Sequence, residues 1–206
     1  MRRRIVILIF SLLVLTACAS EYEVVQFPLR DADLYPLSQT KGGLTIAIDE
    51  ITDRERVTTY FGVDLIETKI LPINIIISNH SDGRYVIKPS DVLLMEGEDV
   101  IDPMPVETVV EVAKEVHGGV SDKASQQMNA FFSKLALQET VVPPRESYQG
   151  VLFFKSKKKA DHSDDEERYF VIRKLYREGR LKIRIAVTNL ETGERIHFGP
   201  VSLSSI

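Results

Sequence analysis

Several features that would identify an enzyme, a metal protein or a disulfide-stabilised domain are missing from this sequence. Its 206 residues include one cysteine, which excludes an intramolecular disulfide, so the stability of the fold must come from its core. It contains no Gly-x-Ser-x-Gly nucleophile motif. We therefore expect a protein that is not an enzyme and that uses neither a metal nor another cofactor. Its four histidines are far apart and none forms a His-x₃-His pair of the kind found in metal sites: His80, His117, His162 and His197.

Long apolar runs are also scarce, and the one at the N-terminus is short. Residues 5–15 are almost entirely apolar, which is about half of the ~20 residues that a membrane-spanning helix needs. Three arginines precede this run, and the small residues Thr16 and Ala17 follow it. A basic start, a short apolar core and a small-residue end predict a bacterial export signal rather than a transmembrane anchor.

The single cysteine stands at the end of this signal. Leu15, Thr16, Ala17 and Cys18 together resemble the lipobox of bacterial lipoproteins. The resemblance implies cleavage before Cys18 and acyl chains, such as palmitate, on its sulfur and on the new amino terminus, and two or more chains anchor a protein stably. Because Ala19 rather than Asp follows, it also implies the periplasmic face of the outer membrane in a Gram-negative cell. An ordinary secretory signal with an incidental thiol is the alternative.

Basic residues are fewer than acidic residues in this sequence. The chain has 26 basic and 30 acidic residues, a net charge of −4. Removal of residues 1–17 leaves 23 basic against 30 acidic side chains, a net charge of −7. A field of this sign disfavours nucleic acid and anionic lipid as partners. We therefore expect contact with the membrane only through the lipid on Cys18.

After the signal, residues 1–17, the chain divides into a short tether and one folded part. Prolines, acidic residues and a Gly-Gly pair interrupt any hydrophobic period over residues 18–42, so we expect a lipidated flexible tether there. Residues 43–206 suit one domain with an elaboration. Hydrophobic residues make up 44% of the chain, which is sufficient for a core.

Most of the folded part shows the two-residue period of β-strands. From residue 70 to residue 79, alternate large apolar side chains share one face, and β-branched residues at this density favour a packed strand. Residues 181–188 alternate in the same way, and residues 189–193 supply a hairpin turn. We predict an antiparallel β-sandwich with strands at about residues 44–48, 70–79, 84–87, 92–95, 148–154, 169–175, 181–188 and 196–203.

In the middle of the chain the period changes to 3.6 residues, which predicts a two-helix insertion at about residues 103–138. The first helix would have Pro105 as its first residue and stop at Gly118 and Gly119, and the second would be capped by Ser121 or Asp122. Such an insertion either covers an open sheet face or presents a surface to a partner. The possible partner surface consists of Phe131, Phe132 and Leu135.

Three segments in this order resemble landmarks of immunoglobulin-like (telokin-like) domains in extracytoplasmic bacterial lipoproteins. Residues 73–82 are a strand that ends in Asn, residues 89–94 carry a Ser-Asp pair, and residues 142–154 contain a Pro-rich turn before a Gly-hydrophobic strand. The resemblance implies an immunoglobulin-like β-sandwich that serves as a binding or assembly module, with no catalytic residues. Two features depart from the pattern: Arg145 stands where Gly is usual, and the helical insertion is extra.

A strongly charged segment follows the strand at residues 148–154. Its lysines lead into Asp161, Asp164, Asp165 and Glu166, and several carboxylates together can bind a divalent cation. The spacing differs from that of a known calcium loop, so a solvated connection between strands is the other interpretation.

The sequence thus predicts a membrane-anchored lipoprotein of the bacterial cell envelope that acts as a non-catalytic protein-binding or assembly accessory. Its expected partners are the membrane, through the lipid at Cys18, and an envelope protein. The alternative is a lipoprotein that binds a small ligand or a divalent cation.

Overall fold

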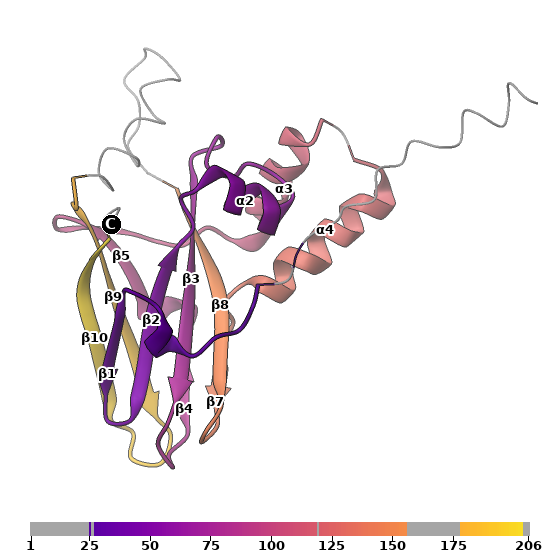
Figure 1. Ribbon diagram of the computed structural model, residues 1–206. Coiled ribbons are helices and arrows are strands. Elements are labelled where there is room, and N and C mark those ends of the chain that lie inside the picture. Colours follow the sequence, from indigo (N-terminus) through magenta and orange to yellow (C-terminus); the bar gives the residue numbers. More distant parts are fainter. Residues whose placement is uncertain (1–24, 26, 119, 156–177, 204–206) are drawn as a thin grey trace, which may run out of the picture.

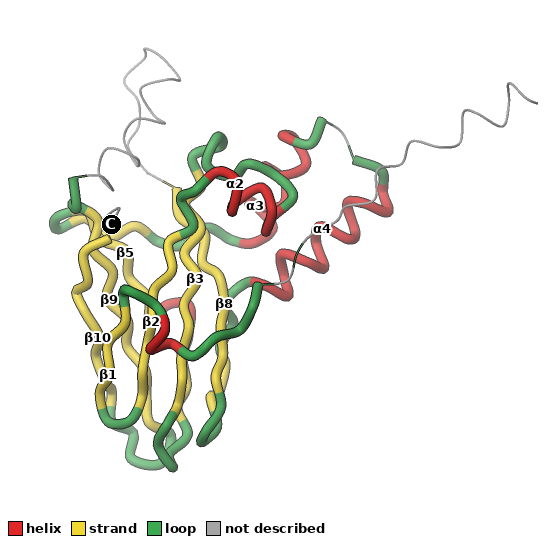
Figure 2. Tube along the Cα trace, viewed as in Figure 1, coloured by secondary structure: helices red, strands yellow, loops and turns green. Residues whose placement is uncertain are grey.

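The computed structural model describes residues 25, 27–118, 120–155 and 178–203 (Figures 1 and 2). The described residues are mostly β, with two antiparallel sheets and three α-helices. The helices are η2 (Ala32–Leu34), α2 (Arg54–Phe61), η3 (Pro89–Asp91), α3 (Val106–Val116) and α4 (Asp122–Leu135). The strands are β1 (Ser38–Lys41), β2 (Leu44–Glu50), β3 (Ile70–Asn79), β4 (Tyr85–Ile87), β5 (Val92–Glu96), β6 (Asp99–Ile101), β7 (Thr140–Val142), β8 (Ser147–Lys155), β9 (Leu181–Asn189) and β10 (Arg195–Leu203).

The two sheets have four and six strands. The first, called here the β3 sheet, has the order β1-β2-β3-β8. The second, the β9 sheet, has the order β6-β5-β9-β4-β7, with β10 also paired to β9. At one side the two sheets meet, where the Gln39 side chain of β1 accepts a hydrogen bond of 2.9 Å from the backbone N–H of Gly199 in β10.

One apolar core lies between the sheets. Alternate residues of β3 and β9 point into it, as the two-residue period predicts, and none of these side chains is more than 1% exposed. Each such side chain stabilises the fold by roughly 1.5–3 kcal/mol relative to an exposed one. They are Leu71, Ile73, Ile75 and Ile77 on β3, and Leu181, Ile183, Ile185 and Val187 on β9.

Helices α2, α3 and α4 gather near one end of the β3 sheet (Figure 2), and a second apolar cluster joins them to the outer face of this sheet; it is called here the helix-covered cluster. Val151 and Phe153 of β8 point outward into it, because they alternate with the core-facing Leu152 and Phe154. Phe132 of α4 packs there with ring centroids 5.7 Å from Phe153, and its side chain is fully buried. The helices therefore cover one end of the outer face of this sheet.

Residues 27–43 pack on the folded domain, which corrects the prediction of a flexible tether for this part of residues 18–42. Phe27 is 9% exposed and packs into the helix-covered cluster, and Ala32 is fully buried. The backbone N–H of Ala32 donates to the Ser78 hydroxyl, and β1 pairs with β2 along its whole length. A run of prolines and acidic residues breaks hydrophobic periodicity, but it does not prevent a chain from being fixed by a few buried anchors.

The strand and helix predictions are otherwise close to the observed elements. The predicted strand at residues 70–79 is β3, and both helices of the insertion form where the 3.6-residue period indicates. The predicted strand at residues 169–175 lies outside the described residues. The sequence left residues 60–65, which overlap the end of α2, open between a strand and a short helix, and it did not predict the short strands β1, β6 and β7.

Candidate functional site

A polar cleft of about 220 Å³ opens on the outer face of the β3 sheet. Strands β2 and β3 form its floor, the segment before η2 forms one wall, and α2 forms another. The lining residues are Phe27, Pro28, Arg30, Tyr35, Asp49, Arg56, Tyr60 and Asn74.

Helix α2 places two of the lining side chains. It begins at the N-cap Asp53, whose carboxylate accepts from the backbone N–H of Arg56 at 2.9 Å, and it ends at Gly62, which has a left-handed φ of 67°. Its buried side, Val57 and Phe61, packs on the helix-covered cluster. Two other side chains of the helix, Arg56 and Tyr60, line the cleft.

An ion pair and an aromatic stack form the cleft wall. The Nη2 of Arg56 lies 2.8 and 3.1 Å from the two carboxylate oxygens of Asp49. The guanidinium of Arg56 also lies over the Tyr60 ring, 5.8 Å from its centroid, and Phe27 stacks on that ring with centroids 4.1 Å apart. These contacts order the wall before any ligand arrives.

The surroundings of the cleft shift the pKa of two of its side chains, Tyr35 and Arg56. Burial, and next the charge of Asp49, raise the pKa of Tyr35 above 10.0, so its phenol is a hydrogen-bond donor at neutral pH. Burial alone would lower the pKa of Arg56, but the hydrogen bond and charge of Asp49 outweigh it and raise that pKa. Arg56 therefore stays charged at any physiological pH.

Asn74 lies at the floor of the cleft with an unsatisfied oxygen. Its side chain is 1% exposed, and its Oδ1 has no hydrogen-bond partner. Asn74 is the register partner of Asp49 across β2 and β3, so the two side chains are neighbours on the outer face.

The neighbouring side chain determines which end of the Asn74 amide is unsatisfied. The carbonyl of Phe27 can only accept, and it takes a 3.1 Å hydrogen bond from Nε2 of Gln149 on β8. Gln149 therefore turns its Oε1 toward Asn74, whose Nδ2 donates a long bond of 3.5 Å to it. The Oδ1 of Asn74 is thus directed away from β8, toward the side of β2 and Asp49.

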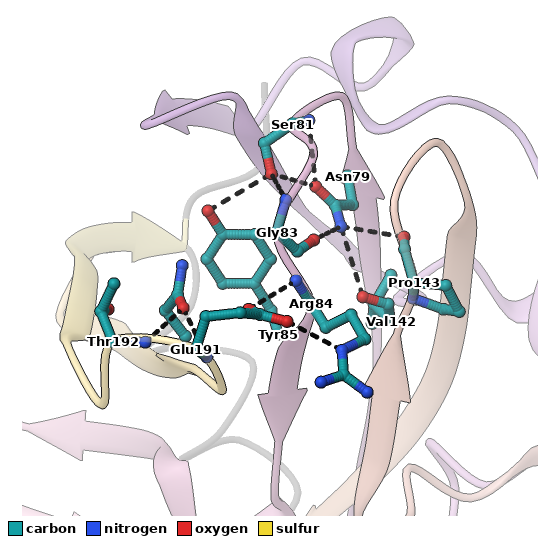
Figure 3. A network of polar contacts seen from close by, with 10 residues as sticks. Asn79, Ser81, Gly83, Arg84, Tyr85, Val142, Pro143, Glu191 and Thr192 are labelled. Carbon is teal, nitrogen blue, oxygen red and sulfur yellow. Dashed lines mark hydrogen bonds and ion pairs between the residues drawn. The ribbon is translucent and has the colours of Figure 1, made fainter.

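A second buried asparagine, Asn79 at the end of β3, fastens the loops at the other end of the sheets (Figure 3). Its Nδ2 lies 2.7 Å from the Gly83 carbonyl and 2.8 Å from that of Pro143, and its Oδ1 accepts from both N–H and hydroxyl of Ser81. Two of the three sequence landmarks, residues 73–82 and 142–154, therefore meet here through Asn79.

The other landmark residues also make structural contacts. Asp91 forms an ion pair with Arg195 of β10. Arg145 has a left-handed φ of 63°, which explains why Gly suits this position, and its guanidinium pairs with Asp82 at 2.8 Å. On the neighbouring hairpin Glu191 accepts from Arg84, and the hydrogen bond from that side chain lowers the pKa of Glu191 below 4.5.

The predicted partner surface on α4 needs correction. Phe132 is fully buried against Phe61 and Phe153, so it cannot contact a partner. Phe131 and Leu135 are half-buried and pack against the same cluster. A helix rotates about 100° per residue, so adjacent phenylalanines cannot face the same way.

The remaining predicted site residues lie outside the described part of the chain. This holds for the lipidation motif, Leu15, Thr16, Ala17 and Cys18, and for the acidic segment, Asp161, Asp164, Asp165 and Glu166. Within the described residues no group of three or more His, Cys, Asp or Glu side chains could hold a metal ion. None of the described helices is long and apolar enough to cross a membrane.

Comparisons with known proteins leave the family open. No protein-family model matches this chain, and no curated protein is significantly similar to it. Similar solved structures include ycdA, a predicted lipoprotein of Bacillus subtilis, with 12% identity over 81% of this chain, a TM-score of 0.39 and only 38% of the ycdA length spanned. The yjhA protein of the same species has 13% identity, a TM-score of 0.36 and coverage of 65% of this chain and 89% of its own. A FixG-related protein of Vibrio parahaemolyticus has 8% identity, a TM-score of 0.36 and coverage of 81% and 100%. Likenesses this weak carry no conclusion about function.

Proposed function

We propose that this protein is a lipid-anchored, non-catalytic binding protein of the bacterial cell envelope whose cleft binds a small ligand. The observation that carries this proposal is the unsatisfied Oδ1 of Asn74 on the cleft floor. A buried polar atom without a partner costs roughly 1–3 kcal/mol. A ligand that donates a hydrogen bond to this oxygen removes the cost. The unsatisfied oxygen therefore lowers the stability of the free protein and favours binding of a hydrogen-bond donor.

The proposal includes the fold family and the location. We assign the two sheets to an immunoglobulin-like sandwich, supported by the contact between Asn79 and Pro143 from two sequence landmarks. The lipobox supports an anchor at Cys18, on the periplasmic face of the outer membrane if the cell is Gram-negative. Phe27, which is packed in the fold, is nine steps along the chain from Cys18, and at 3.3–3.6 Å per step these span at most about 32 Å. The cleft would thus operate close to the membrane surface.

Thermal stability measured against a small-molecule library tests the binding site. The sample is the full mature protein, extracted in mild detergent, and the variants are Asn74→Leu in the cleft and Arg84→Gln at the distant hairpin. Ligand at 100 times its Kd adds about 2.7 kcal/mol of stability, which raises Tm by roughly 5–10 °C for a chain of this size. We expect such a shift for the wild type and for Arg84→Gln, and none for Asn74→Leu. An equal shift in Asn74→Leu would contradict the proposed site.

A protein-binding or assembly role is the second candidate, favoured by two exposed leucines close to the cleft. Leu29 and Leu34 are 52% and 70% exposed. Crosslinking in intact envelopes, with the wild type compared to Cys18→Ser and Leu34→Glu, tests this role. Leu190→Glu is the matched control, because Leu190 is exposed on the distant hairpin. A partner lost in the first two variants and retained in the control supports the role, and an unchanged set of crosslinks argues against it.

Binding of a divalent cation by the acidic segment stays a prediction. Calcium titration of the mature protein by calorimetry tests it, and the absence of heat would argue against calcium binding by this segment.

A further inference from the structure

The floor of the cleft presents two acceptors side by side. Asp49 and Asn74 face each other across β2 and β3, at the Cβ separation of about 4.5–5.5 Å that register partners have. The Oδ1 of Asn74 can only accept, and the Asp49 carboxylate has lone pairs beyond those that Arg56 uses. A group that fits between them must donate hydrogen bonds and is favoured by positive charge, as an ammonium or an amide N–H is.

The walls present donors instead. Arg30 and Arg56 both line the cleft, and Tyr35 remains a phenol at neutral pH. Arg56 uses one nitrogen on Asp49 and keeps further N–H donors on its planar group. With two guanidiniums and one carboxylate, the cleft favours an anionic group at its walls, and guanidinium groups match a carboxylate in geometry.

The Tyr60 wall and the volume favour a small ligand. Sugars and nucleobases are bound by stacking on an open aromatic face, and Tyr60 does not offer one, because Phe27 stacks on its ring and the Arg56 guanidinium also lies over it. The volume of about 220 Å³ is below the 300–1,000 Å³ that is usual for a drug-sized ligand. The ligand is therefore small, with its two polar groups close together.

We infer that the cleft binds a carboxylate that has an N–H donor on the adjacent carbon. A free α-amino acid provides this pair, and so does the carboxy-terminal residue of a peptide. The nitrogen would lie between Asp49 and Asn74, and the carboxylate would face Arg30 and Tyr35. This assignment rests on the proposed binding function and specifies the ligand of the same site.

Removing each polar group of the ligand in turn tests the assignment. The probes are L-leucine, isopentylamine, which lacks the carboxylate, 4-methylpentanoate, which lacks the amine, and glycyl-leucine, with glucose as the neutral control. Kd values are measured by ligand-observed NMR on the full mature protein. We expect L-leucine or glycyl-leucine to bind at least tenfold more tightly than either stripped analogue. The tighter of these two identifies the source as a free amino acid or a peptide end.

Variants then locate each group. Arg30→Gln should weaken L-leucine and 4-methylpentanoate by about tenfold and leave isopentylamine unchanged, because it removes one charged contact to the carboxylate. Asn74→Leu should weaken L-leucine and isopentylamine and leave 4-methylpentanoate unchanged. Arg84→Gln, outside the cleft, should alter none of these values.

The outcomes separate this inference from the proposed function. Equal binding of L-leucine and one stripped analogue overturns the assignment of two polar groups. Binding of glucose, or of another library compound, that depends on Asn74 overturns the ligand class and leaves the binding site in place. If no compound in the thermal screen binds, with water alone on Asn74 in a crystal structure, both conclusions fail.

Discussion

Two asparagines on the same strand differ in what surrounds them. Asn74 and Asn79 both lie on β3 and both are 1% exposed. Asn79 uses both ends of its amide, with Gly83, Val142 and Pro143 as acceptors and Ser81 as donor (Figure 3). Asn74 makes one long hydrogen bond and leaves its oxygen without a partner.

This difference separates a structural role from a functional one. Burial removes both amides from water at the same cost, and only Asn79 recovers that cost within the fold. Each of its bonds joins a loop to β3, so it determines how the loops close. Asn74 fixes no loop, and the residue lines the floor of the cleft. Equal burial therefore says less about a polar residue than the number of its partners.

The largest effect is expected from Asn79→Leu. This change leaves the buried carbonyl of Val142 and the partly buried carbonyls of Gly83 and Pro143 without their donor, so the free energy of unfolding should fall by about 3 kcal/mol or more. Urea denaturation measures it through the midpoint at constant slope. A loss below about 1 kcal/mol would contradict the structural role of Asn79.

Asn74→Leu should act in the opposite direction. The leucine has the same number and branching of side-chain heavy atoms as asparagine, and it removes an unsatisfied oxygen while losing only one long hydrogen bond to Gln149, so the free energy of unfolding should stay equal or rise by about 1 kcal/mol. The same urea denaturation applies. A loss of 2 kcal/mol or more would mean that Asn74 supports the fold as Asn79 does, and the comparison would fail.

Arg145→Gly tests the loop that Asn79 fastens. Gly accepts the left-handed φ of 63° without a Cβ penalty, while the lost ion pair with Asp82 is highly exposed and contributes little. The net gain should be about 0.5 kcal/mol, seen as a rise in Tm. Arg145→Ala is the control, since it loses the ion pair, keeps the Cβ and should not gain stability.

Glu191→Gln should have the smallest effect, and one that depends on pH. The folded-state pKa of Glu191 is lowered, so its stabilisation is fully present above 4.5 and is lost as the pH falls through the folded-state value. The Tm of the variant should be slightly lower than that of the wild type at pH 7 and equal to it in acid. A gap that widens in acid would contradict this sign.

Much of the fold could be predicted from local patterns. Alternation placed β3 and β9, and the 3.6-residue period placed α3 and α4, because each pattern records which side of an element is buried. Helix α2 has no clear 3.6-residue period, because it buries only Val57 and Phe61. Its clearest sequence signals are the capping residues Asp53 and Gly62. Strand β1 has no apolar alternation and forms because the edge of β2 offers hydrogen bonds.

The candidate site could not be predicted in the same way. Asn74 stands in a run of isoleucines, where a single polar residue is the only sign of a special position. Its unsatisfied oxygen depends on Gln149, 75 residues away, and on the carbonyl of Phe27, which the sequence assigned to a tether. Tyr35, Asp49 and Arg56 come from three separate elements and carry no shared motif.

The sequence by itself determined the periodicity of the strands and helices, the negative charge of the chain and the presence of a lipobox, because these depend only on neighbours along the chain. The tertiary structure alone decided that Phe132 is core, that residues 27–37 pack on the sheet, and which buried asparagine lacks a partner. These properties depend on which distant groups come within hydrogen-bonding or van der Waals distance, and such contacts are settled only when the two sheets and the helices pack together.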